Sequence, residues 1–194
     1  MKGTRDLIFR IAKKLFARNG LTDTTMDDVA KEAHIGKGTI YHYFDSKEQV
    51  YCLIIEQDMY EIKKELEKLV AAESTPDKKL AAYIMGRMKL MVRFSGFYQM
   101  FRKDYIDYYG YIRKAYEKYR DFEMGNITQF VKEGVEKNLF RIEDPDFAAF
   151  VIVQAIKGME YQLALDPPVE VERKVGIMLK IFLTGITNKA NTNY

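Results

Sequence analysis

The chain begins with a helical pattern of apolar residues. Steps of one, three, four and one residues place a set of side chains on one face of a first helix: Leu7, Ile8, Ile11, Leu15 and Phe16. We expect this helix to stop at Asn19-Gly20, because glycine commonly follows the last helical residue. The pattern predicts an amphipathic helix at the start of an all-α protein.

Two short helices and a long one are predicted next. Thr25 has the character of an N-cap, with Asp28 three residues on in a variant of the capping box. Gly36 caps a third short helix with the sequence KGTIYHYF. Ser46 then caps a long helix that we expect to run to about Ala72. Two short helices joined by a tight turn and braced by a third form a helix-turn-helix.

The second helix of such a pair is the one that lies in the major groove of DNA. Ile40 and Phe44 are four residues apart and point the same way, so we expect them to face inward. Their predicted neighbours in the core are Leu15, Phe16, Val29 and Ala30. The side chains left to face DNA are Lys37, Gly38, Thr39, Tyr41, His42 and Tyr43.

Residues 4–51 resemble the TetR family of bacterial transcriptional repressors. The resemblance is carried by the run KGTIYHYFDSKEQV and by Phe16, Gly20, Thr25, Met26, Val29, Ala30, Ala33 and Ile35. It implies that the helix from Lys37 to Tyr43 contacts operator bases, and that Thr25, Tyr41 and Lys47 hold phosphates.

Two positions depart from the family pattern. His34 stands in the turn where the family prefers glycine, and histidine tolerates a positive φ better than most residues. Gly36 stands where serine or threonine is common, so a phosphate contact at this position is limited to the backbone amide. Neither departure removes the predicted turn.

The same roles follow from physical chemistry. Lys47 follows the N-cap Ser46, where free backbone amides and the positive end of the helix dipole attract a phosphate. Such contacts fix register without selecting sequence. Selection falls to Lys37 toward guanine acceptors and to Thr39 toward a thymine methyl or a base edge. His42 and Tyr43 are further candidates, although solvent exposure explains His42 equally well.

We expect a helix-turn-helix DNA-binding domain at residues 1–50 and a helical ligand-binding and dimerisation domain at residues 51–194. Methionines and aromatics after Leu80 suit an adaptable, mostly apolar pocket for a small-molecule effector. Ordinary core packing is the alternative. The candidate pocket residues are Met85, Met88, Met91, Phe94, Tyr98, Phe101 and Tyr105. In the family, ligand occupation lowers the affinity for DNA.

Two apolar helices are predicted at the C-terminal end, one capped by Asp144 before Pro145 and one starting after Asp166-Pro167-Pro168. They suit a four-helix bundle across a two-fold axis, or else they close the core of the monomer. The family resemblance favours a homodimer on a palindromic operator. The candidate interface residues are Ala148, Ile152, Ala155, Met159, Met178 and Phe182.

Composition adds little to this picture. The net charge of the chain is +3, and residues 1–50 have nine basic and seven acidic side chains. The overall charge therefore does not indicate DNA binding, and any positive surface for DNA must be formed by a local group of residues. Acidic residues are scattered among lysines, a distribution typical of solvated helix faces. We expect a cytoplasmic protein with no membrane span, no metal and no cofactor.

No arrangement typical of an enzyme occurs. Two histidines and one cysteine offer no nucleophile-base pair, and the sequence lacks a glycine-rich phosphate loop. The stronger alternative to a DNA-binding regulator is a ligand-binding helical protein of the same fold with weak or vestigial DNA binding.

Overall fold

The computed structural model describes residues 2–93, 105–163 and 166–187. Within these ranges the chain is all-α, as predicted, with eight helices and no strand. Their bounds are α1 Lys2–Asn19, α2 Met26–Glu32, α3 Lys37–Tyr43, α4 Lys47–Ala71, α5 Pro76–Arg93, α7 Tyr105–Glu136, α8 Pro145–Leu163 and α9 Pro168–Ile186. No helix among the described residues is long and apolar enough to cross a membrane.

The chain divides into two compact units. The first comprises the chain up to Tyr60 and a later segment that ends at Glu117, and the second comprises Glu61–Arg93 with the chain from Lys118 onward. Helices α4 and α7 therefore contribute residues to both units. The predicted domain boundary between residues 50 and 51 stays a prediction.

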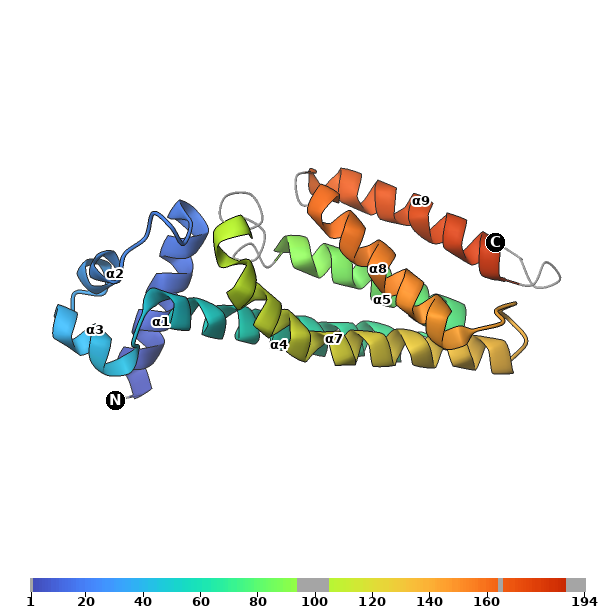
Figure 1. The fold of residues 1–194 in the computed structure, drawn as a ribbon, viewed down its shortest axis with the longest axis horizontal. Helices are drawn as coiled ribbons and strands as arrows, with labels where there is room; N and C mark the ends of the chain where they lie inside the picture. The colour runs from blue at the N-terminus through green and yellow to red at the C-terminus, as the bar shows by residue number, and fades with distance from the viewer. Residues whose placement is uncertain (1, 94–104, 164–165, 188–194) are drawn as a thin grey trace. The chain divides into compact units, whose positions relative to one another are not determined.

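The first unit is built around the start of α4, where α1, α2 and α3 gather (Figure 1). Phe16 of α1 packs edge-on against Tyr51 of α4, with ring centroids 5.7 Å apart. Lys13 forms an ion pair with Asp58, whose side chain is only 2% exposed. These contacts join α1 to the first part of α4, beyond the point at which the sequence suggested that the head ends.

The predicted helix ends in the first unit are confirmed. Gly20 follows α1 with a φ of 88°, and its amide donates to the carbonyl of Phe16 at 2.9 Å. At the start of α4, the Ser46 hydroxyl accepts from the amide of Gln49 at 3.2 Å. The side chain of Gln49 accepts in turn from the amide of Asp45 at 2.8 Å. Local signals therefore determined these boundaries.

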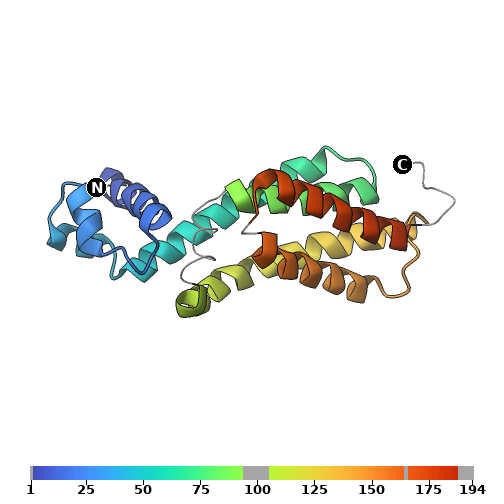
Figure 2. The same ribbon diagram turned by 90° about the horizontal axis from the view of Figure 1, so that it is seen from above.

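The second unit is a helical bundle in which α5 packs against α9 (Figures 1 and 2). Its interior contains an ion pair between Arg87 and Glu123, whose side chains are at most 1% exposed. The hydroxyls of Tyr83 and Tyr119 lie 3.4 Å apart. Burial raises the pKa of Tyr83, so its phenol stays neutral. This unit therefore has a polar group of residues inside an otherwise apolar core.

The expectation that acidic residues lie on solvated faces was wrong for two positions. Asp58 and Glu123 are buried. Asp58 forms an ion pair with Lys13, and Glu123 forms one with Arg87. A buried carboxylate needs such a partner because its desolvation is otherwise too costly. Composition alone does not reveal which acids have found one.

Helix α7 was not predicted as an element. It ends in a turn in which Asn138 has a φ of 57° and the amides of Leu139 and Phe140 both donate to the carbonyl of Gly134. A Cβ on Gly134 would lie 2.1 Å from the Phe140 ring, so a larger residue does not fit there. Phe140 also forms an isolated β-bridge with Thr187, which ties this turn to the end of α9.

Candidate nucleic-acid interface

The interface begins with the N-terminus of α2. Thr25 adopts an extended N-cap conformation, and its hydroxyl accepts from the amide of Asp28 at 3.1 Å. The carboxylate of Asp28 accepts from the amide of Thr25 at 2.9 Å and from its hydroxyl at 2.6 Å. These bonds lower the pKa of Asp28, the Thr25 hydroxyl contributing most. The predicted capping box is confirmed.

A tight turn connects α2 to α3. His34 has a φ of 52°, which is the left-handed conformation expected for this position. The amide of Ile35 donates to the carbonyl of Ala30 at 3.0 Å, and Gly36 then caps α3 without a side-chain hydrogen bond. The geometry is that of a helix-turn-helix.

Helix α3 has one buried side and one exposed side. Ile40 is fully buried and Phe44, just after the helix, is 2% exposed. The exposed positions are Lys37, Gly38, Thr39, Tyr41 and His42, whereas Tyr43 is half-buried. The inward orientation predicted for Ile40 and Phe44 is thus confirmed, as is the burial of Leu15, Phe16, Val29 and Ala30.

Comparison with known proteins agrees with this geometry. Residues 8–51 match the family model described as bacterial regulatory proteins, tetR family. The head of the chain, residues 8–51, belongs to the TetR family.

Two curated relatives are transcriptional regulators. An uncharacterized HTH-type transcriptional regulator of Bacillus subtilis, YhgD, is 22% identical over 94% of this chain and 96% of its own. IcaR of Staphylococcus aureus, the negative regulator of the biofilm operon icaADBC, is 43% identical over 47 residues, 24% of this chain and 25% of IcaR. The second match thus spans about a quarter of that relative.

The fold is also shared over nearly the whole chain. The crystal structure of a transcriptional regulator from Cytophaga hutchinsonii covers 94% of this chain and 98% of its own, with a TM-score of 0.76 and 21% identity. This likeness shows that the two chains share the same arrangement of helices. The chain is a transcriptional regulator whose DNA-binding helix-turn-helix is of the TetR type.

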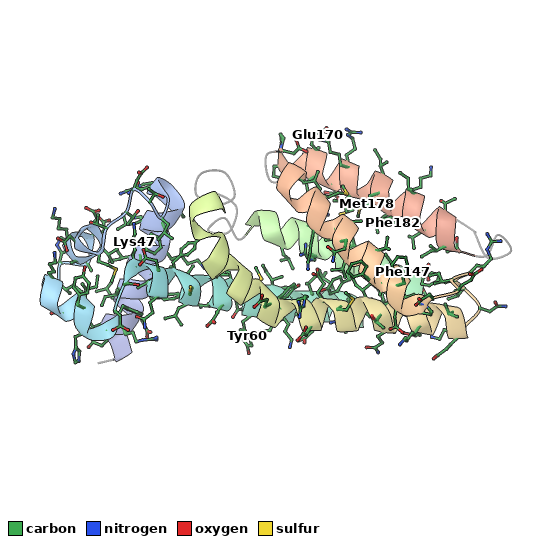
Figure 3. The ribbon with its side chains drawn as sticks, viewed as in Figure 1. Lys47, Tyr60, Phe147, Glu170, Met178 and Phe182 are labelled. Carbon is green, nitrogen blue, oxygen red and sulfur yellow. The ribbon has the colours of Figure 1, made fainter. Side chains whose placement is uncertain are left out.

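In this TetR-family head, the ammonium of Lys47 forms hydrogen bonds with backbone carbonyl groups. It donates to the carbonyls of Leu21 at 2.8 Å, Thr24 at 3.2 Å and Thr22 at 3.3 Å. An ammonium has three donors, so these bonds use all of them. Lys47 therefore ties the start of α4 to the turn that leads into the N-cap Thr25 (Figure 3). Its predicted phosphate contact stays a prediction.

Sequence reasoning missed two contacts made by α3 and the residue that follows it. The ammonium of Lys37 donates to the carboxylate of Asp27 at 2.9 Å, which joins α3 to α2. The guanidinium of Arg5 lies over the Phe44 ring, 5.2 Å from its centroid, and so places a cation beside the end of α3. Neither pair is close in sequence, so no local signal identifies it.

The predicted effector pocket falls largely outside the described residues. Phe94, Tyr98 and Phe101 lie there, and the side chains of Met91 and Tyr105 are likewise not described. On α5, Met85 is half-buried and Met88 is buried. The second unit also has an open hollow of 680 Å³. It is lined by other residues, all on α7: Asp121, Met124, Gly125, Thr128, Gln129, Lys132, Glu133 and Glu136.

The candidate dimer residues divide by burial within the chain. Ile152 and Met178 are buried, whereas Ala148, Ala155, Met159 and Phe182 are half-buried. The candidate list leaves out the large apolar side chains that are exposed on these helices: Phe147, Phe150, Val151, Val169, Ile177 and Ile181. Figure 3 places Met178 and Phe182 on α9 and Phe147 on α8.

Replacing Lys47 by methionine keeps the length of the side chain and removes all three of its hydrogen bonds. We expect Lys47→Met to lower the free energy of unfolding by about 1–2 kcal/mol, because three carbonyls lose a charged donor at a half-exposed site. Urea denaturation measures the change. Lys14→Met is the matched control, because Lys14 is exposed and lies 3.8 Å from Glu32. Equal stability of the two variants would contradict the role assigned to Lys47.

Proposed function

We propose that this regulator is a ligand-responsive repressor that binds a palindromic operator as a homodimer. A small, mostly apolar or aromatic effector binds the helical body and releases the protein from DNA. Repression is supported by the relative IcaR, which is a negative regulator. The protein acts on the chromosome and so works in the cytoplasm, without catalysing a reaction.

The observation that carries the DNA-binding part is the exposed face of α3. Lys37, Thr39, Tyr41 and His42 present donors, an acceptor hydroxyl and apolar surface, yet none of them is needed to fill the core. N-terminal residues of a recognition helix contact base edges, so Lys37 and Thr39 select bases. Thr25, Tyr41, the Gly36 amide and the start of α4 at Lys47 position the head on phosphates.

Gly38 is the second observation in favour of a close approach to DNA. A Cβ at this position would meet no atom within 4 Å, so packing in the head does not require glycine. Glycine in a helix destabilises the helix relative to alanine. A glycine that the fold does not need is explained if the helix backbone approaches a ligand closely, and the major groove is the ligand that a recognition helix meets.

The effector part rests on the interior of the second unit. Buried Met88 is a polarizable, adaptable side chain, and Tyr83 and Tyr119 add hydroxyls to the same unit. Effector binding reaches the head through α4, which has residues in both units and whose first residue, Lys47, holds the turn before α2. Release requires that the effector bind the DNA-free arrangement better than the DNA-bound one.

The homodimer rests on exposed apolar side chains of α8 and α9. Ile181 is 66% exposed and Phe147 is 61% exposed, and Phe147 stacks on Phe150 with centroids 6.2 Å apart. A face of this kind is covered when two copies meet about a two-fold axis. The half-buried Ala148, Ala155, Met159 and Phe182 complete the proposed interface.

Selection of binding sites from random duplex DNA tests the proposed function directly. We expect the purified protein to enrich a palindrome whose half-site centres are roughly 34 Å apart or a multiple of that spacing. Lys37→Ala should relax the preference at particular positions, whereas Tyr41→Ala should weaken all sites evenly. If no sequence is enriched at moderate salt, the head does not select sequence, and a ligand-binding protein with vestigial DNA binding is the better account.

Gly38→Ala separates folding from DNA binding. We expect this variant to be more stable by about 0.5–1 kcal/mol, because alanine favours the helix, and yet to bind the selected duplex about tenfold more weakly, because the methyl blocks the approach of α3. Thermal unfolding and fluorescence anisotropy measure the two effects. Gly125→Ala is the control, since its Cβ also meets no atom within 4 Å but lies on α7. Unchanged DNA affinity in Gly38→Ala would contradict the close approach.

Charge on the exposed face of α9 tests the dimer. We expect Ile177→Glu combined with Ile181→Glu to raise the dissociation constant of the dimer at least about a hundredfold, because buried carboxylates at an apolar interface have no partner. Sedimentation equilibrium measures it. Lys180→Glu, on an exposed position of the same helix, is the control. If the double variant remains as dimeric as the control, this face is not the interface.

A further inference from the structure

The ion pair between Asp27 and Lys37 joins the two helices of the helix-turn-helix on their exposed side. The ammonium of Lys37 lies 2.9 Å from the carboxylate, and the two side chains are 64% and 46% exposed. Asp27 raises the pKa of Lys37, mainly through this hydrogen bond. A pair so exposed adds little to stability, because water screens it and the long lysine side chain must be held in one geometry.

Lys37 is the first residue of α3, so its flexible side chain has two kinds of acceptor within reach on DNA. One is a guanine edge in the groove, which depends on sequence, and the other is any phosphate, which does not. A lysine that binds phosphates freely strengthens binding to every duplex. Selectivity therefore requires something that disfavours the phosphate contact.

Asp27 has the chemistry to do this. An ammonium has three donors, so Lys37 can keep its bond to Asp27 while it donates to guanine O6 or N7. A phosphate is anionic, so it attracts Lys37 but repels the Asp27 carboxylate 2.9 Å from the ammonium, whereas a guanine edge carries no net charge and does not repel that carboxylate in the same way. The penalty falls on the phosphate contact and spares the base contact.

We propose that Asp27 is a specificity-determining residue, which holds Lys37 for base edges and opposes its contact with phosphates. The neighbouring acid is excluded from this role, because Asp28 is engaged by the amide and hydroxyl of Thr25 in the capping box. Two adjacent carboxylates thus have separate tasks, one in folding and one in selection. The proposal rests on the proposed DNA-binding function.

The test compares affinities for the selected duplex and for a scrambled duplex of equal length and composition, measured by fluorescence anisotropy over a range of salt. We expect Asp27→Asn to bind the scrambled duplex about three- to tenfold more tightly, with a salt slope steeper by about one unit, because Lys37 now neutralises one more phosphate. The affinity for the selected duplex should change by less than about twofold, and its salt slope should stay close to that of the wild type. On this duplex Lys37 contacts a base rather than a phosphate, so the substitution adds no phosphate contact.

Two control experiments show whether the effect of Asp27→Asn requires Lys37 and whether a neighbouring acid has the same effect. In a Lys37→Gln background, Asp27→Asn should no longer alter the ratio of the two affinities. Asp28→Asn removes the negative charge from the capping box and should lower stability slightly while leaving that ratio as in the wild type. If Asp27→Asn changes both affinities by the same factor, or acts equally in the Lys37→Gln background, the proposal for Asp27 is overturned. If the wild type itself does not distinguish the two duplexes, the proposed function fails with it.

Discussion

Burial of Ile40 and Phe44 is the constraint on which the exposed surface of α3 depends. Helix α3 has seven residues, too few to be stable alone, so it is helical because these two side chains are buried in the head, where α3 packs against α2 and Arg5 of α1 lies over the Phe44 ring. The anchoring also determines which residues point outward. Lys37, Thr39 and Tyr41 are exposed because Ile40 and Phe44 are not, and sequence selection in the proposed function follows from that one division.

Local chemistry allowed the head to be predicted from the sequence. Thr25 and Asp28 form a capping box, and His34 takes the positive φ of the turn, because each depends on neighbours within a few residues. Contacts between distant residues were not predictable in this way. The acceptors of Lys47 lie more than twenty residues away, and the partner of Glu123 is on another helix. The candidate pocket and the candidate dimer interface also depend on contacts between distant residues, so the sequence indicated them only through composition. The structure shows exposed apolar side chains on α8 and α9 that were not among the candidate interface residues.

Charged side chains in this protein act according to their burial. Arg87 and Glu123 are enclosed, so each requires the other, and loss of one partner leaves a buried charge. Lys47 is half-exposed and satisfies carbonyls, which makes it a brace between α4 and the turn before α2. Lys37 and Asp27 are exposed, so their pairing contributes little to folding and is available for DNA. Charged residues of the same types therefore stabilise the core, connect helices, or remain available at the surface, depending on how deeply they are buried.

Substitution of 7-deazaguanine for each guanine of the selected duplex tests the central claim most directly, because it removes the N7 acceptor and leaves base pairing intact. The account predicts that one position in each half-site weakens wild-type binding by about tenfold and has no further effect on Lys37→Ala, because the contact is already lost. If no guanine shows this dependence on Lys37, the first residue of α3 does not contact a guanine N7, and the account of the interface is contradicted.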